Sequence, residues 1–274
     1  MTNADRPAGP YASTRDLPSF VELEQQLRGG KTLTRVVGRK LRPQMLEIEA
    51  QMNRIVAIVD GFYALLGDRN WVFHDSLNVE NVAAIVEGGL GAEDAEHRFV
   101  ELYEDPDTLR FMIGHLNRHH AMRRRRHLVD RAVIDYAAGR YDAVVLRLLS
   151  VMDGFVNDFE TVRRGLHARD IDDMQAWDTV VGHHLGLAHA HRSFTKTIGK
   201  TVEDECYELH RNGIVHGTIL NYNNVVIATK AWNRLFAVAD WATGREKQQA
   251  PAEAKPRLRD VLKQVVTNDQ TKKE

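Results

Sequence analysis

The stretch from Arg211 to His216 reads Arg-Asn-Gly-Ile-Val-His and combines side chains that suit chemistry on a phosphate. The planar guanidinium of Arg211 can hold a phosphate through two parallel hydrogen bonds. The imidazole of His216 can accept or donate a proton near neutral pH without a metal. Asn212 can hydrogen-bond the phosphate or orient the histidine. These residue types predict that Arg211, Asn212 and His216 form a site that cleaves RNA.

The Arg–x4–His spacing alone is weak evidence, because chance produces it in a chain of this composition. With 27 Arg and 13 His in 274 residues, such a pair is expected about 27 × 13/274 ≈ 1.3 times. Requiring Asn directly after Arg lowers this expectation to about 0.06. Three pairs have the spacing, and the first and last also have the Asn: Arg69/His74, Arg110/His115 and Arg211/His216.

The earlier of the two Asn-bearing copies, Arg69-Asn70 with His74, lies in a different setting. It follows Gly67-Asp68 and alternates polar and apolar residues, which predicts a loop or a short extended stretch. We therefore expect His74 to fix this loop over a buried Trp71 and Phe73. Arg69, Asn70 and His74 are kept as secondary site candidates.

The motif resembles the R-x4-6-H motif of the HEPN superfamily, the helical proteins named from higher eukaryotes and prokaryotes nucleotide-binding. The wider pattern is similar to Apea-like HEPN domains: 126–141 and 148–154 look like their opening helix pair, and 211–241 looks like their motif and final helix. The resemblance covers roughly residues 115–243. It implies an all-α, up-and-down helical bundle that forms a homodimer, with both motifs lining one cleft.

The resemblance also implies an activity, that of a metal-independent endoribonuclease of the kind found among toxins and antiviral defence effectors. A neutral histidine would take the proton of the ribose 2′-OH, and a protonated histidine would donate to the leaving 5′-oxygen. Arg211 would stabilise the charge of the transition state, and the product would end in a 2′,3′-cyclic phosphate. Asp153 is a weaker candidate for an acidic residue near the motif. No cofactor is expected.

Two other interpretations stay open. The first is a catalytically inactive HEPN-like dimer that binds RNA or acts as a scaffold, with an inhibitor or partner protein docking on an amphipathic segment at 258–266. The second is a metal site in the histidine-rich run 183–191. Its histidines are spaced five and two apart from 184 onward, whereas ligands on a helix should be three or four apart, so no metal is expected.

Composition limits the function classes. The net charge of −1 excludes a bulk binder of polyanions, and the lone Cys206 excludes an internal disulfide and fits a reducing cytosol. No apolar run of 18 residues and no secretion signal is present, so we expect a cytoplasmic protein without a membrane partner.

The charge is unevenly distributed along the chain: an acidic stretch at 87–107 precedes a basic one at 114–131. The basic stretch either neutralises the acidic one or binds RNA phosphates through Arg118, Arg123, Arg124, Arg125 and Arg126.

Periodicity divides the chain into four parts. Residues 1–18, with three prolines, are expected to be a mobile arm, and 19–104 an N-terminal helical region of unknown role. Residues 105–243 are expected to form the HEPN-like bundle, and 244–274 a polar tail carrying the amphipathic segment. We expect helices over 19–29, 43–66, 79–88, 93–104, 105–138, 141–165, 171–198, 201–210 and 224–241.

Overall fold

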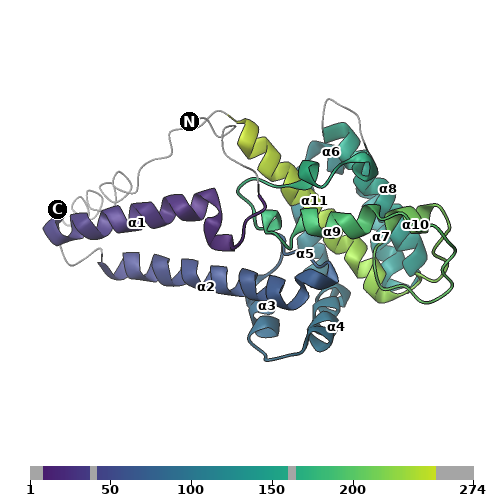
Figure 1. Ribbon diagram of the computed structural model, residues 1–274, viewed down its shortest axis with the longest axis horizontal. Coiled ribbons are helices and arrows are strands. Elements are labelled where there is room, and N and C mark those ends of the chain that lie inside the picture. The colour runs from purple at the N-terminus through teal and green to yellow at the C-terminus, as the bar shows by residue number, and fades with distance from the viewer. Residues whose placement is uncertain (1–8, 38–41, 160–164, 251–274) are drawn as a thin grey trace.

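The computed structural model describes residues 9–37, 42–159 and 165–250, and within these it confirms the all-α class (Figure 1). These residues contain no strand, only two isolated bridges. None of the described helices is long and apolar enough to cross a membrane. The helices are α1 (Pro18–Val37), α2 (Arg42–Leu66), α3 (Val79–Val86), α4 (Ala92–Glu104), α5 (Pro106–Leu116), α6 (His120–Arg123), α7 (Arg126–Ala137), α8 (Tyr141–Phe159), α9 (Leu187–Thr195), α10 (Arg211–Val215) and α11 (Val225–Gln249).

Helix α11 is the central element of the fold. It begins where the side chain of Asn224 accepts a hydrogen bond from the backbone N–H of Ile227, as the Asn-rich segment before it predicts. Every residue from Ile227 to Ala239 is buried. Helix α8 packs along α11, and α7 packs along α8 (Figure 1). Because this stretch is enclosed on all sides, its polar side chains Thr229, Lys230 and Asn233 bond groups inside the protein.

One hydrophobic core joins the two helical regions that the sequence predicts. Its buried side chains run from Ile58 in α2 to Ala242 in α11, and α11 also contacts α4 and α5. The expected boundary near residue 104 therefore does not separate two cores. Helix α1 and the first part of α2 form a hairpin that projects away from the other helices (Figure 1).

The helix expected over 105–138 is wrong, because the chain bends twice within it. Helix α5 ends at Leu116, and the bend at 117–119 turns the ring of His119 inward. The Nε2 atom of His119 lies 3.1 Å from the hydroxyl of Thr243, and its ring packs 5.4 Å from that of Phe155. Met122, in the short α6, is also buried. Tertiary packing thus overrides a helical pattern in which no proline marks the break.

Two further expected helices are wrong. Within 171–198 only α9 is an α-helix, because glycines let the preceding chain fold tightly on itself. A Cβ on Gly186 would lie 2.3 Å from the carbonyl oxygen of Val181. The segment 201–210 is not helical. Its backbone N–H groups at Val202 and Cys206 donate to the carbonyl oxygens of Thr218 and Asn221, at 2.7 and 2.9 Å. It lies alongside the chain that follows the motif.

The chain ends also differ from expectation. The predicted mobile arm is packed against the protein from Gly9 onward. The backbone N–H of Tyr11 donates to the carbonyl oxygen of Gly182. The hydroxyl of Ser13 and the backbone N–H of Thr14 both donate to the carboxylate of Asp60. Helix α1 is longer than predicted, and α11 runs on to Gln249. Residues 1–8 and the predicted amphipathic segment 258–266 lie outside the described residues.

Candidate functional site

The predicted motif forms a single tight turn. Helix α10 spans Arg211–Val215, and His216 is its C-cap. Gly217 follows with a φ of +69°, a conformation that favours glycine. A Cβ on Gly213 would lie only 2.7 Å from Cδ1 of Ile219, so the return of the chain after the turn also requires glycine there. The two glycines therefore fix how the chain leaves the turn.

Arg211 and Asn212 are both tied to neighbouring helices. The NH2 group of Arg211 donates to Oδ2 of Asp153 in α8 at 3.0 Å, and its NH1 group donates to Oδ1 of Asn212 at 3.3 Å. The Nδ2 group of Asn212 donates to the carbonyl oxygen of Thr195 at 2.7 Å. The side chain of Arg211 is only 12% exposed. The structure thus brings together Arg211, Asn212 and Asp153, three of the predicted site residues.

His216 is placed differently from Arg211. Its side chain is exposed, and its ring makes no hydrogen bond with any described residue. The described contacts include no hydrogen bond or ion pair between Arg211 and His216. This is expected, because the two positions lie about 140° apart around a helix. Arg211 points to α8, whereas His216 is free to meet a ligand from solvent.

His167 joins this group although nothing in the sequence singles it out. It lies in a 3-10 turn (Leu166–Ala168), and its Nδ1 atom is 3.6 Å from Oδ1 of Asp153. Asp153 therefore lies between His167 and Arg211, which are 44 residues apart in the chain (211 − 167). No motif spacing connects these positions, so only the fold could reveal the group.

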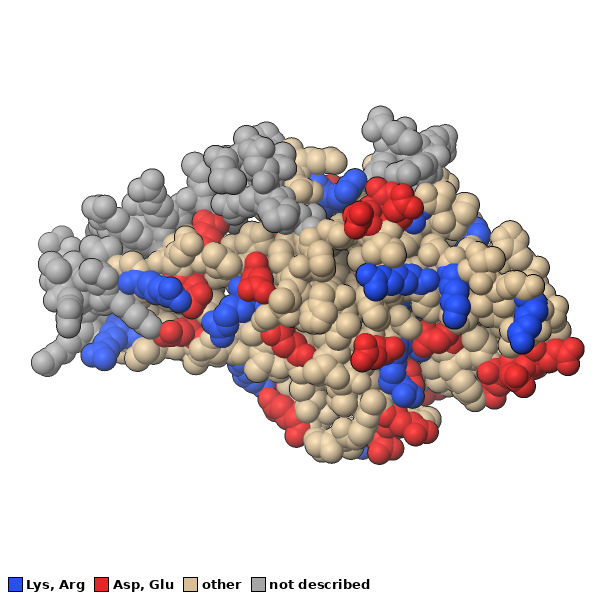
Figure 2. Space-filling view, viewed as in Figure 1, with Lys and Arg blue, Asp and Glu red and all other residues tan. Residues whose placement is uncertain are grey.

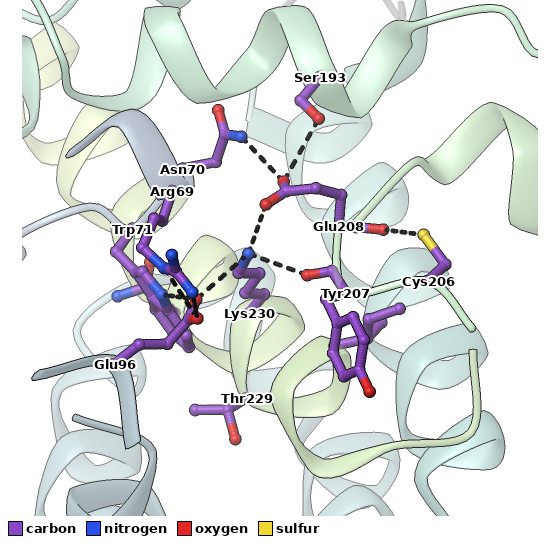
Figure 3. Close-up of polar contacts among 12 residues, drawn as sticks. Arg69, Asn70, Trp71, Glu96, Ser193, Cys206, Tyr207, Glu208, Thr229 and Lys230 are labelled. Carbon is purple, nitrogen blue, oxygen red and sulfur yellow. Dashed lines mark hydrogen bonds and ion pairs between the residues drawn. The ribbon is translucent and has the colours of Figure 1, made fainter. Parts of the chain in front are cut away.

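A buried ammonium anchors the chain that leads into the motif (Figure 3). Lys230 is in α11, and its side chain is 4% exposed. Its Nζ atom donates to Oε1 of Glu208 at 2.5 Å and to the carbonyl oxygen of Tyr207 at 2.9 Å. It also lies 5.5 Å from the centre of the Trp71 ring. Glu208 comes three residues before Arg211, so this contact fixes the motif segment to the central helix.

The Arg69-Asn70 pair belongs to the same network (Figure 3). Nδ2 of Asn70 donates to Oε2 of Glu208 at 2.8 Å. Nε of Arg69 and Nε1 of Trp71 donate to Glu96 at 2.9 and 2.7 Å, and Oε1 of Glu96 lies 3.6 Å from Lys230. Burial raises the pKa of Glu96, but the hydrogen bond from Arg69 and the charge of Lys230 outweigh this and hold it below its usual value. Asn70 therefore contacts the segment before the motif directly, whereas Arg69 is connected to it through Glu96 and Lys230.

His74 lies inside the core with Trp71 and Phe73, and all three side chains are buried. Its Nε2 atom is 2.7 Å from the hydroxyl of Tyr103, and its Nδ1 atom is 2.8 Å from that of Ser76. Burial lowers the pKa of His74 to about 3, so the ring is neutral near pH 7. The geometry matches a residue that fixes the loop.

The predicted RNA-binding arginines are not equivalent. Arg125 packs against α8, where its NH2 group donates to Asp158 at 2.8 Å and its side chain is 17% exposed. Arg126 faces Asp130 at 3.8 Å, and Nε of Arg123 donates to the backbone. Three of these arginines are exposed and make no ion pair with a described residue: Arg118, Arg123 and Arg124. On the face shown in Figure 2, acidic and basic side chains are interspersed.

The buried histidines of the run 183–191 have separate partners in the fold. His183 is buried and stacks on Tyr63 at 4.1 Å, whereas Nε2 of His191 bonds the carbonyl oxygen of Arg169 at 3.0 Å. Burial lowers the pKa of both histidines to about 4. No group of three or more His, Cys, Asp or Glu side chains that could hold a metal ion occurs in the described part of the chain.

Comparison with known proteins identifies no relative, because no family model, curated protein or solved structure matches this chain. Membership of the HEPN superfamily therefore stays a prediction from the residues of the motif and the helical pattern around it.

The burial of Lys230 predicts a large loss of stability on its removal. We expect Lys230→Met to lower the free energy of unfolding by about 3–5 kcal/mol, because Glu208 and Glu96 lose the cation between them. The double variant Lys230→Met/Glu208→Gln should be less destabilised than the single one, since it leaves one uncompensated charge fewer. Urea denaturation measures both.

The matched control is Arg54→Met, which breaks the exposed ion pair of Arg54 and Glu80 at 2.6 Å. It should leave the denaturation midpoint nearly unchanged, because exposed pairs contribute little. A Lys230→Met protein as stable as the wild type would contradict the role of this network.

The buried His74 predicts a specific dependence of stability on pH. Its pKa is about 3 in the fold and 6.5 ordinarily. The unfolded chain therefore binds a proton that the folded one does not, and stability falls as pH drops from 6.5 toward 3, by up to about 1.4 kcal/mol per pH unit. His74→Gln should flatten this decline between pH 6 and 4, whereas His97→Gln, at an exposed position, should not. Equal slopes for the wild type and His74→Gln in urea titrations would contradict the assignment.

Proposed function

We propose that this protein is a metal-independent endoribonuclease of the HEPN type. The observation that carries the proposal is the geometry of one turn: Arg211 and Asn212 are held by Asp153 and Thr195, while His216 at the end of the same turn is exposed. A fixed phosphate ligand and an accessible proton carrier are the two groups that cleavage of RNA by its own 2′-hydroxyl requires.

The proposed reaction needs no group from outside the protein and the RNA. His216 in its neutral form takes the proton of the ribose 2′-OH, and the oxygen attacks the adjacent phosphorus. The bond from phosphorus to the 5′-oxygen breaks, and a second histidine, in its protonated form, donates a proton to that oxygen. Arg211 stabilises the charge that develops on the phosphate. The products are a 2′,3′-cyclic phosphate and a 5′-hydroxyl.

A second copy of the chain is part of this proposal. Val215 is 45% and Leu220 51% exposed, one on each side of His216 in sequence. Apolar side chains beside the motif suit a two-fold interface that places both motifs in one cleft. The exposed Arg118, Arg123 and Arg124 would bind phosphates of the RNA further from the cut. A role as toxin or antiviral effector is the biological setting that we propose.

The rival function is a non-catalytic RNA-binding or scaffold protein. The observation that favours it is the ion pair of Arg211 with Asp153, which leaves the arginine side chain 12% exposed. An arginine so held can serve the fold alone. Cleavage assays separate the two functions directly.

The nuclease proposal predicts cleavage in the presence of EDTA. Purified protein incubated with labelled tRNA and labelled single-stranded RNA should produce fragments ending in a 2′,3′-cyclic phosphate. His216→Ala should lower the rate by about 10²–10⁴-fold, the usual contribution of general acid–base catalysis.

The control is His97→Ala, because His97 is an exposed histidine on α4. It should cleave like the wild type. RNA that binds but stays intact would favour the scaffold function. Cleavage that His216→Ala does not affect would show that another group moves the proton.

The basic surface predicts a measurable salt dependence. If Arg118 and Arg124 contact phosphates, the double variant Arg118→Ala/Arg124→Ala should bind RNA more weakly. The slope of log affinity against log salt should then fall by about 0.7–0.9 for each phosphate that the variant no longer neutralises. Binding titrations from low to physiological salt measure this, with Arg54→Ala/Arg98→Ala as the control. An unchanged slope would exclude these arginines from the RNA interface.

A further inference from the structure

The carboxylate of Asp153 contacts a second side chain besides Arg211. Its Oδ2 atom accepts the hydrogen bond from Arg211, but its Oδ1 atom is buried and has no hydrogen bond with any described residue. Buried carboxylate oxygens nearly always have a partner. Nδ1 of His167 lies 3.6 Å from this Oδ1, within ion-pair range and just beyond a hydrogen bond. A small rotation of the ring would make the bond.

The local backbone keeps space for this histidine. A Cβ on Gly165 would lie 2.9 Å from Nδ1 of His167 and 3.3 Å from Oδ1 of Asp153. Any other residue at 165 would therefore push the ring away from the carboxylate. The side chain of His167 is 45% exposed, so with Nδ1 facing Asp153 the opposite edge of the ring, which carries Nε2, can meet a ligand.

We propose that His167 is the second catalytic histidine of this site, the general acid that protonates the leaving 5′-oxygen. The inference rests on the proposed nuclease function. A carboxylate behind Nδ1 fixes which ring nitrogen carries the proton and balances the charge of the imidazolium. This chemistry needs a proton donor besides the His216 that acts as base. The same Asp153 accepts the hydrogen bond of Arg211, so His167 and the arginine of the motif are held together within one chain.

The protons and bonds of this reaction balance. The 2′-OH gives its proton to His216, the new bond from 2′-oxygen to phosphorus forms, and the bond from phosphorus to 5′-oxygen breaks. The proton on Nε2 of His167 passes to the 5′-oxygen, which leaves as a hydroxyl. His216 ends protonated and His167 neutral, and exchange with solvent restores both.

A substrate with a sulfur leaving group tests the proposal. An oligoribonucleotide that contains the linkage cleaved by the wild type is made twice, with the normal 5′-oxygen or with a bridging sulfur there. A thiolate leaves without being protonated, so it needs no general acid. We expect His167→Ala to cleave the oxygen substrate about 10²–10⁴-fold more slowly than the wild type. It should cleave the sulfur substrate at close to the wild-type rate.

The comparison variants separate the outcomes. His216→Ala should be slow on both substrates, because it removes the base, and His97→Ala should be normal on both. His167→Ala that is equally slow on both substrates, or normal on the oxygen substrate, would overturn the assignment while the nuclease function stands. A wild type that cleaves neither substrate would overturn both proposals.

The protonated ring nitrogen gives a readout that does not depend on cleavage. Long-range proton–nitrogen NMR correlations of the full chain, assigned with His167→Gln, should show the neutral ring of His167 carrying its proton on Nδ1. Gly165→Ala, which displaces the ring, should lose this preference. A ring that carries its proton on Nε2 in the wild type would contradict the contact with Asp153.

Discussion

The contact between the ammonium of Lys230 and the carboxylate of Glu208, 2.5 Å apart inside the protein, is the interaction on which the candidate site depends. A charge in the interior is tolerated only when paired and hydrogen-bonded, and Lys230 has two carboxylates, a carbonyl oxygen and the face of Trp71 around it. Lys230 belongs to the central helix, Glu208 to the segment before the motif, and Glu96 to α4. One buried cation thus joins three parts of the chain.

The site consists of a rigid part and an accessible part. Arg211 and Asn212 are held by α8 and α9, and the network around Lys230 holds the chain just before them. His216, past the end of the turn, faces solvent, as does the far edge of His167. Such a division suits catalysis, because a fixed arginine determines where the phosphate lies, and exposed imidazoles can exchange protons with water after each cycle.

The sequence predicts elements better than it predicts contacts. The helices over 43–66, 79–88, 93–104 and 224–241 follow from apolar spacing and from caps such as Asn224, and all are present with shifted ends. The bend at 117–119 depends on packing against distant helices, and no local pattern marks it. At Gly186 the chain turns back on Val181, five residues before it. Arg211 and Asp153 can each be selected from the sequence, but their ion pair joins residues 58 apart. The bond of Asn70 to Glu208 spans 138 positions.

The proposed mechanism requires that the ribose 2′-oxygen, and not water, attacks the phosphorus. Cleavage of RNA in chelator and in water enriched in oxygen-18, followed by mass spectrometry of the earliest product, tests this most directly. The mechanism predicts a 2′,3′-cyclic phosphate that carries no heavy oxygen. A linear phosphate labelled with heavy oxygen from the first time point would mean hydrolysis by water and would contradict it, as would RNA that is bound and never cut.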